Sequence, residues 1–407
     1  MRTFLSIVAV SVAGVVLVCF IVSSKIDSNF NRIVSSGRAV RSGSPTPSGA
    51  DSQARAKIQS QIKSAKRLHS SLTVVDLHAD SLLWNRDLLK RNERGHVDVP
   101  RLIEGNVAVQ VFTIVTKVPE DMNIGSNSGD SDKITGLSIV QGWPPSTWRS
   151  LSQRTLFQAD KLRDFARRSG GKLTVVESVS DLDNYLSRRE REHDITAGIL
   201  GIEGAHALEG DLKNIDVFYD RGIRLIAPVH FFDNNIGGSA HGKKRGGLTP
   251  LGIKMIEKMQ KKGMIVDLAH ASPAVFRDAI RISTRPIVVS HTGVKGTCNN
   301  NRNLSDDQLR GVARTGGVIG IGYWKTAVGG RDVGAIVRAI KYATRVAGVD
   351  HVSLGSDFDG AVTTPFDASQ LSLVTEALQK AGFTDEEIAK IMGGNALRVF
   401  KEVLPES

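Results

Sequence analysis

The stretch TVVDLHADSLLW (residues 73–84) runs an apolar, β-branched segment directly into His78 and Asp80. Acidic and imidazole side chains cost free energy when they are buried without partners. His78 and Asp80 are two residues apart, so both side chains point to the same side of a strand. The pair is therefore predicted to grip one cation, whereas Asp76 points to the opposite face and is expected to play a supporting role.

The same pattern of a short apolar run followed by an ionisable residue recurs along the chain. Eight such runs are predicted to be strands: residues 72–77, 106–115, 197–202, 222–229, 263–268, 286–290, 316–322 and 351–356. Helix-like segments lie between several of them, at residues 155–168, 250–262, 272–282, 305–315 and 331–347, and a last one covers 383–402. Near-continuous apolar strands that alternate with helices are typical of a parallel sheet covered by helices. Eight units predict an α/β fold of the closed (β/α)8, TIM-like barrel type.

In such a barrel the carboxyl ends of the strands meet at one mouth, where the enzymes of this fold carry their active sites. The polar residues at the predicted strand ends are His78, Asp80, Glu203, His230, His270, His291, Asp357 and Asp359. A single histidine at a strand end is more often structural, and an Asp before a Gly is usually a turn residue. Six strand ends repeat the pattern, so the sequence predicts one common site.

Histidines and carboxylates without cysteine match a borderline or hard divalent metal ion such as Zn²⁺. His78 and Asp80 are predicted to hold one ion and His270 and His291, on adjacent strands, a second, with Glu203 bridging the two. Two ions about 3.5–4 Å apart would polarise a carbonyl group and turn a bridging water into hydroxide near neutral pH. This donor set therefore predicts a hydrolase with two metal ions.

The motifs VVDLHAD, GILGIEGAHAL, GMIVDLAHAS, RPIVVSHTGVKGTCNNNRNLSDDQL and HVSLGSDFDG resemble, in this order, those of the membrane (renal) dipeptidase family, whose members are binuclear zinc metallopeptidases on a barrel fold. The resemblance implies zinc-dependent hydrolysis of dipeptides with the ligands named above. It also implies that His230 contacts the substrate carbonyl and that Asp357 moves a proton from the attacking water to the leaving amine. Arg302 would bind the substrate carboxylate, for which its planar fork is suited. A homodimer is expected from the same resemblance.

The chain departs from the family pattern after His230, where it reads PVHFFDNNIGGSAHGKKRGG (residues 228–247). Family members commonly have a Thr before this His and an Asn soon after it. We therefore expect loop 231–247, which contains His241, to decide the substrate, and residues 116–150 to form an inserted lid. Two alternative functions are a related binuclear metal hydrolase for another amide, lactam or modified amino-acid conjugate, and a non-catalytic binding protein on a barrel scaffold.

The N-terminal part of the chain differs in composition. The segment FLSIVAVSVAGVVLVCFIV (residues 4–22) has 19 residues without a charge, close to the roughly 20 that span a bilayer. Residues 1–24 are therefore predicted to be a transmembrane anchor or, alternatively, a cleaved secretion signal. Residues 25–52 are predicted to be a flexible linker, and residues 53–407 the hydrolase domain outside the cytoplasm, in the periplasm or the extracellular space.

The net charge of +11 arises mainly in residues 1–70, which supply +8. The remaining chain has no basic patch interleaved with aromatic residues, so no nucleic-acid partner is expected. The whole chain has two cysteines, Cys19 and Cys298, and only Cys298 lies in the predicted folded part. No disulfide and no cysteine metal site are therefore expected there. The histidines at positions 69, 96, 193 and 351 lie in helical or connecting segments and are interpreted as surface or capping residues.

Overall fold

The computed structural model describes residues 49–407 of the chain. The predicted transmembrane segment and most of the predicted linker fall on residues 1–48 and lie outside the described residues. None of the described helices is long and apolar enough to cross a membrane. Residues 58–407 form one compact unit, and the fold described below is that of this unit.

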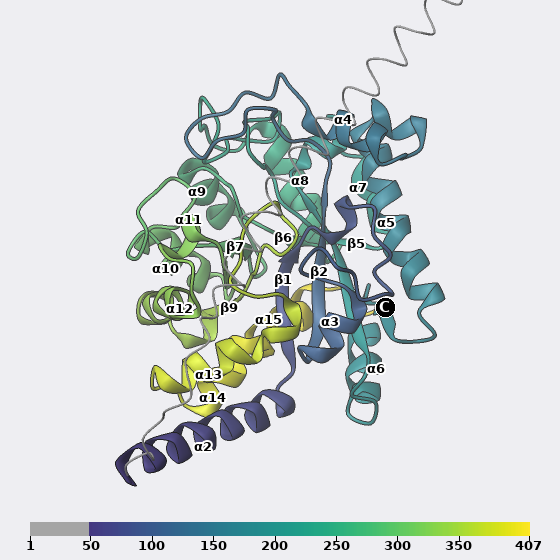
Figure 1. Cartoon of the computed structure of the whole chain (residues 1–407). Helices are drawn as coiled ribbons and strands as arrows, with labels where there is room; N and C mark the ends of the chain where they lie inside the picture. The colour runs from purple at the N-terminus through teal and green to yellow at the C-terminus, as the bar shows by residue number, and fades with distance from the viewer. Residues whose placement is uncertain (1–48) are drawn as a thin grey trace, which may run out of the picture. The chain divides into compact units, whose positions relative to one another are not determined.

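Eight parallel strands of residues 58–407 follow one another around a curled sheet (Figure 1). They are β1 (Val74–Ala79), β2 (Val107–Val115), β4 (Thr196–Glu203), β5 (Ile223–Ile226), β6 (Ile265–Val266), β7 (Val288–Thr292), β8 (Val318–Ile321) and β9 (Val352–Leu354). Their order in the sheet is β6-β5-β4-β2-β1-β9-β8-β7. A parallel bridge between Asp267 and Val288 connects the two end strands. The eight predicted strands are confirmed, and the curled parallel sheet is that of the predicted TIM-like barrel.

One strand of the sheet was not predicted. β3 (Leu173–Val175) pairs with the first half of β4, where Val175 lies opposite Gly198. Only Leu173 of its three residues is buried. A strand this short and this exposed carries too few apolar residues to be recognised in the sequence.

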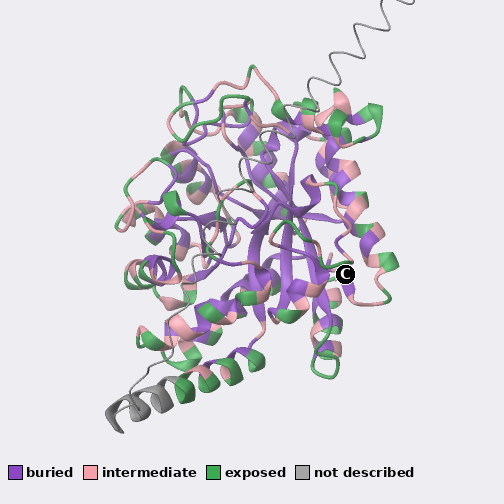
Figure 2. Cartoon of the chain, viewed as in Figure 1, coloured by how far each residue is buried: buried purple, intermediate pink, exposed green. Residues whose placement is uncertain are grey.

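Helices lie around the sheet, and their inner faces are buried while their outer faces are exposed (Figure 2). The helices of the described residues are α2 (Gly49–Ser71), α3 (Val99–Glu104), α4 (Lys133–Val140), α5 (Leu151–Arg168), α6 (Val179–Arg189), α7 (Asn214–Asp220), α8 (Pro250–Lys261), α9 (Pro273–Ile282), α10 (Asp306–Arg314), α11 (Lys325–Val328), α12 (Val333–Ala347), α13 (Ser372–Lys380), α14 (Asp385–Ala389) and α15 (Asn395–Val403). α2 is the exception to this arrangement, because most of its residues from Gln59 onward are exposed. α8 begins where its sequence indicates, because the Thr249 side chain accepts a hydrogen bond from the Gly252 N–H and Pro250 occupies the first turn.

The helix predicted over residues 383–402 is present from Asp385 to Val403, but it is kinked. α14 ends at Ala389, a π-helical segment covers Lys390–Gly394, and α15 begins at Asn395. Gly393 approaches the backbone before β1 so closely that a Cβ atom at this position would lie 1.9 Å from the carbonyl oxygen of Thr73. Only glycine can approach the backbone this closely. The chain changes from α-helix to π-helix where this contact occurs.

The interpretation of His69 as a surface or capping residue is also wrong. Its ring is buried, with Nδ1 2.8 Å from Thr375 Oγ1 and Nε2 3.0 Å from the Gly105 carbonyl oxygen. Burial lowers the pKa of His69. A neutral histidine therefore connects the end of α2 to α13 and to the end of α3.

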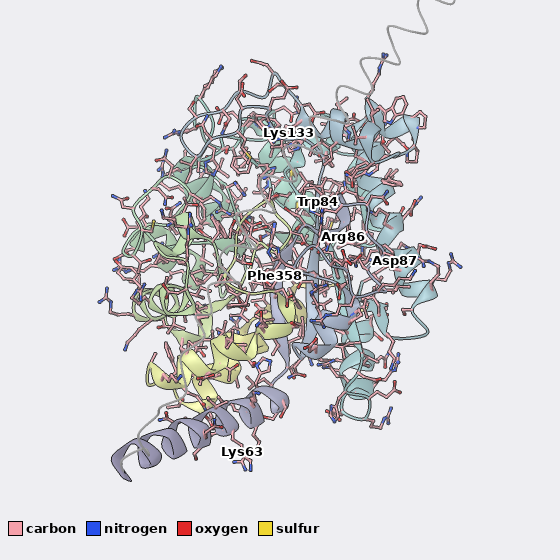
Figure 3. The ribbon with its side chains drawn as sticks, viewed as in Figure 1. Lys63, Trp84, Arg86, Asp87, Lys133 and Phe358 are labelled. Carbon is pink, nitrogen blue, oxygen red and sulfur yellow. The ribbon has the colours of Figure 1, made fainter. Side chains whose placement is uncertain are left out.

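The loop that follows β1 is held at the mouth of the barrel by Asp359, a buried residue after β9. Asp359 Oδ2 accepts hydrogen bonds from Ser81 Oγ at 2.6 Å and Arg86 Nη2 at 2.5 Å, and Oδ1 accepts one from the His96 N–H at 2.7 Å. Trp84, labelled near Arg86 in Figure 3, donates from Nε1 to the Asp359 carbonyl oxygen at 2.8 Å. Burial alone would raise the pKa of Asp359, but the hydrogen bonds and the Arg86 charge outweigh it and lower the pKa to about 2. Asp359 therefore has a structural role.

We expect Asp359→Asn to lower the free energy of unfolding by about 3 kcal/mol, because the largely buried Arg86 guanidinium loses its counter-charge. Urea unfolding at pH 7 measures the effect. Because the folded-state pKa is depressed, the stabilisation is present above the ordinary value of 3.8 and is lost as the pH falls through about 2. Asp307→Asn, in which the replaced side chain is 96% exposed, is the matched control. Equal unfolding free energies for the two variants would show that Asp359 does not hold the loop.

Candidate metal centre

Glu203, the last residue of β4, stands at the centre of a buried cluster of histidines. Its Oε1 lies 2.9 Å from His270 Nε2, 3.2 Å from His291 Nε2 and 3.7 Å from His78 Nε2. Its Oε2 lies 3.1 Å from His230 Nε2. These residues come from or follow five different strands, whose carboxyl ends share one mouth of the barrel.

Asp80 and Asp357 form another side of the cluster. His78 Nε2 lies 3.4 Å from Asp80 Oδ1, and Thr113 on β2 donates to the same oxygen at 2.5 Å. The ligand atoms of His78, Asp80 and Asp357 lie within 4.8 Å of one another. Two further groups in the described part of the chain meet the same limit and share Glu203: one with His78 and His291, the other with His230 and His270.

The structure thus brings together all the predicted ligands and also His230, Asp357 and Arg302. Asp359, also at a predicted strand end, has the structural role described above instead. The grouping by distance differs from the predicted division. His291 is grouped with His78, His270 is grouped with His230, and Asp357 joins His78 and Asp80. His291 Nε2 also lies 3.0 Å from His270 Nε2. Arg302, the predicted carboxylate-binding residue, is buried at the same mouth. Its Nη2 donates to the His291 carbonyl oxygen at 2.7 Å, and its guanidinium lies 5.4 Å from the centre of the Trp324 ring.

His78 has the properties of a ligand for a cation. Its Nε2 is buried and has no hydrogen-bond partner among the described residues. Burial opposes a charge on this ring, but Glu203, Asp80 and Asp357 outweigh burial and raise the pKa of His78 to about 10. In the absence of a metal ion the ring therefore carries a proton, which metal binding would release.

The other histidines are already in the state that a metal ion requires. Burial keeps the pKa values of three rings well below the ordinary value: His230, His270 and His291. Neutral imidazoles present a lone pair, and neutral imidazoles with carboxylates are the preferred ligands of Zn²⁺ in proteins without cysteine at the site. The residues present therefore fit a divalent metal ion.

Two residues of the site have a left-handed backbone conformation, with φ at +61° for both His270 and Asp357. A non-glycine residue in this region costs roughly 1–3 kcal/mol, and such residues gather at functional sites. Nothing in the sequence indicates this strain.

Three polar residues that hold the predicted ligands were not predicted: Thr113, Asp267 and Ser290. Thr113 donates to Asp80, and Ser290 contacts His78, His291 and Asp267. Each interrupts an apolar strand motif, in QVFT, MIVDLAH and PIVVSH respectively. A polar residue inside a buried strand is the signal that would have found them.

The two loops that were expected to border the substrate are linked to each other. Asn127 donates from its N–H to the His241 carbonyl oxygen at 2.7 Å. The fully buried His241 ring lies with Nδ1 2.9 Å from the Ile124 carbonyl oxygen and with its centre 5.2 Å from that of His270. Arg245 donates to the Gly125 carbonyl oxygen. Segment 116–132 and loop 231–247 therefore form a joint cover beside the cluster, and α4 follows in the predicted insertion.

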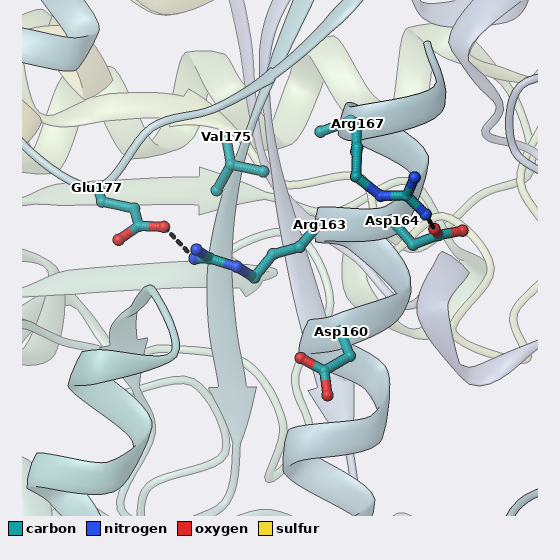
Figure 4. Close-up of a pocket in the computed structure, with 7 residues that line it drawn as sticks. Asp160, Arg163, Asp164, Arg167, Val175 and Glu177 are labelled. Atoms are coloured by element: carbon teal, nitrogen blue, oxygen red, sulfur yellow. Dashed lines mark hydrogen bonds and ion pairs between the residues drawn. The ribbon is translucent and has the colours of Figure 1, made fainter.

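A hollow of about 560 Å³ lies between α5 and β3 (Figure 4). Its charged residues are paired: Arg163 with Glu177, Arg167 with Asp164, and Asp160 with Arg221. Val175, which lines the hollow, pairs with the first half of β4, whereas Glu203 ends that strand. The hollow therefore does not contribute to the candidate metal centre.

Comparison with known proteins places the chain in a family. Residues 62–405 match the family described as membrane dipeptidase (peptidase family M19). A Klebsiella pneumoniae protein from the pqqA 5′ region is 33% identical over 258 residues, which cover 60% of this chain and 93% of that protein. An uncharacterized dipeptidase of Schizosaccharomyces pombe (strain 972) is 30% identical over 318 residues, which cover 75% of this chain and 73% of that protein.

A solved structure shares the fold. The metallopeptidase of Rhodobacter sphaeroides, liganded with a phosphinate mimic of the dipeptide L-Ala-D-Ala, matches with a TM-score of 0.67 at 24% identity and covers 82% of this chain and 99% of that one. The family match spans the whole barrel and contains all the residues of the cluster. The chain therefore belongs to the membrane dipeptidase family, peptidase family M19, and is a metal-dependent dipeptidase.

Proposed function

We propose that this enzyme hydrolyses dipeptides with two zinc ions, held by His78 and Asp80 on one side and by His270 and His291 on the other, with Glu203 bridging. The observation that carries the proposal is the position of Glu203, a buried carboxylate with one oxygen within 3.7 Å of three imidazole nitrogens. Bound zinc would polarise the scissile carbonyl and lower the pKa of the attacking water.

Two residues are assigned to the substrate. Arg302 binds the terminal carboxylate, which is the feature that restricts the enzyme to peptides of two residues; its burial strengthens such a charge-assisted pair. His230, whose Nε2 lies 3.1 Å from Glu203 Oε2, is assigned to the carbonyl oxygen, where a ring N–H stabilises the negative charge of the tetrahedral intermediate.

Asp357 is assigned the proton transfer. It takes a proton from the attacking water and delivers it to the amine that leaves. Burial raises the pKa of Asp357 to about 8. A carboxyl group in this range can both accept and donate a proton near neutral pH.

A substrate screen on the purified full-length, zinc-loaded protein tests the proposal. It compares L,L- and L,D-dipeptides with the same dipeptides amidated at the C-terminus, and with lactams and N-acyl amino acids. We expect cleavage of dipeptides with a free carboxylate and a roughly 10- to 150-fold lower kcat/KM for the amidated forms, because Arg302 loses a charged partner. Cleavage of another amide without cleavage of any dipeptide would favour the related hydrolase instead.

We also propose that residues 4–22 anchor the enzyme in a membrane, with the catalytic domain outside the cytoplasm, and that the enzyme is a homodimer. The uncharged 19-residue segment supports the anchor, and the family resemblance supports the dimer. Protease digestion of cells whose outer membrane or wall has been removed, with the inner membrane left intact, tests the first point, and light scattering of the purified protein tests the second. A catalytic domain that resists protease until the inner membrane is lysed, or a monomeric mass, would contradict them.

A further inference from the structure

Ser290 joins two predicted metal ligands that come from different strands. Its Oγ lies 2.9 Å from His78 Nδ1 and 2.9 Å from His291 Nδ1. The two imidazole rings lie against each other with their centres 3.6 Å apart. Ser290 is fully buried on β7, so its hydroxyl depends on these protein partners. One hydroxyl thus contacts a predicted ligand of each metal ion.

The third partner of this hydroxyl decides where its proton lies. Ser290 Oγ is 2.6 Å from Asp267 Oδ2. The carboxylate of Asp267 is itself fixed, because Oδ1 accepts from the backbone N–H of Ser290 at 2.8 Å and of Ala269 at 3.0 Å. Since a carboxylate only accepts, Ser290 donates its single proton to Asp267. The lone pairs of Oγ are left for the two histidines.

The direction of these bonds sets the tautomer of both rings. A lone pair of Ser290 Oγ only accepts, so His78 and His291 each carry a proton on Nδ1. The Nε2 atom of a neutral ring then presents its lone pair. Both Nε2 atoms face Glu203 Oε1, at 3.7 Å for His78 and 3.2 Å for His291. These are the atoms that would bind the metal.

We infer that Ser290 is a positioning residue which, together with Asp267, holds His78 and His291 in the metal-binding tautomer and links the two halves of the centre. The inference rests on the proposed function, because it assigns the two rings to two metal ions. Its distinctive consequence is that one change at the hydroxyl weakens the binding of both ions. By contrast, the loss of a single ligand would first weaken the binding of the one ion that this ligand holds.

The test compares zinc binding by the metal-free full-length protein and its variants Ser290→Ala and Asp267→Asn. Competition with a chromogenic chelator gives the two zinc dissociation constants, and thermal unfolding without metal reports on the fold. In Ser290→Ala we expect both constants to rise roughly 10- to 100-fold, the usual effect of removing a partner that orients a ligand.

Asp267→Asn keeps the shape of the side chain, removes its charge and reverses the direction of the bond to Ser290. Its amide group would donate to Ser290 Oγ and turn the hydroxyl proton towards one histidine, which must then carry its own proton on Nε2. We expect weaker zinc binding and an altered absorption spectrum of the cobalt(II)-substituted protein. This variant decides the question if Ser290→Ala does not fold.

Ser353→Ala is the matched control. Ser353 lies on β9, is as buried as Ser290, and its hydroxyl has no hydrogen-bond partner among the described residues. The Ser353→Ala variant should therefore retain the zinc dissociation constants of the wild type. Wild-type zinc dissociation constants in Asp267→Asn and in folded Ser290→Ala would overturn the inference but leave the proposed function intact. Variants with lower thermal stability and unchanged zinc dissociation constants would have the same consequence. A wild-type protein that binds no zinc would overturn the proposed function, and the inference with it.

Discussion

Glu203→Gln is expected to lose both metal ions and to reduce kcat/KM by roughly 10³-fold or more, since bound metal contributes several kcal/mol to the transition state. Among residues 49–407, Glu203 is the one carboxylate whose two oxygens face histidines on both sides, with Oε1 2.9 Å from His270 Nε2 and Oε2 3.1 Å from His230 Nε2. Glutamine keeps the size of the side chain but removes its charge and replaces one oxygen by an NH₂ group, which cannot bind a cation.

Metal analysis of the purified variant after dialysis, together with dipeptide turnover, measures this effect. Glu209→Gln is the control, because Glu209 lies six residues further along the chain and is exposed. The control should keep wild-type metal content. Two zinc ions bound to Glu203→Gln with wild-type affinity would show that Glu203 does not bridge.

Asp357→Asn, unlike Glu203→Gln, should keep a metal content near that of the wild type. Its turnover should nevertheless be roughly 10²- to 10⁴-fold lower. Asparagine has nearly the same shape as aspartate and tolerates the left-handed backbone that Asp357 adopts at φ +61°. The substitution therefore removes the group that transfers the proton and leaves the loop in place.

The outcome of Asp357→Asn separates two roles that the geometry allows. Asp357 lies close enough to His78 and Asp80 to share a cation with them. If Asp357→Asn lost a metal ion as well as activity, Asp357 would be a ligand and the proton transfer would need another residue. Metal analysis beside steady-state kinetics distinguishes the two cases.

The barrel and its mouth were predictable because buried parallel strands have an unusually clear sequence signal. All nine residues of β2 and all eight of β4 are buried, so each strand reads as a largely apolar run. The run stops at the first residue that reaches the mouth, as at Glu203. At six of the eight predicted strands, the end of the run therefore marked both the end of a strand and a candidate site residue.

The residues that orient the ligands were not predictable in the same way. The hydrogen bond between Ser290 and His78 joins residues 212 positions apart, and no periodicity within one strand reveals such a pairing. The same holds for His69, whose partner Thr375 is 306 positions away. Local patterns report which face of an element is buried, whereas these contacts depend on which elements become neighbours.

The hydrogen bonds between the two loops beside the site also restrict how this enzyme can be altered. A graft that exchanged loop 231–247 alone would leave the carbonyl oxygens of Ile124 and Gly125 and the N–H of Asn127 without their present partners. Of the three residues Asn127 is buried, and its N–H would cost about 1–3 kcal/mol if it were left unsatisfied. New substrate ranges in this branch of the family should therefore arise through paired changes in two segments more than a hundred residues apart, and engineering should transplant both segments together.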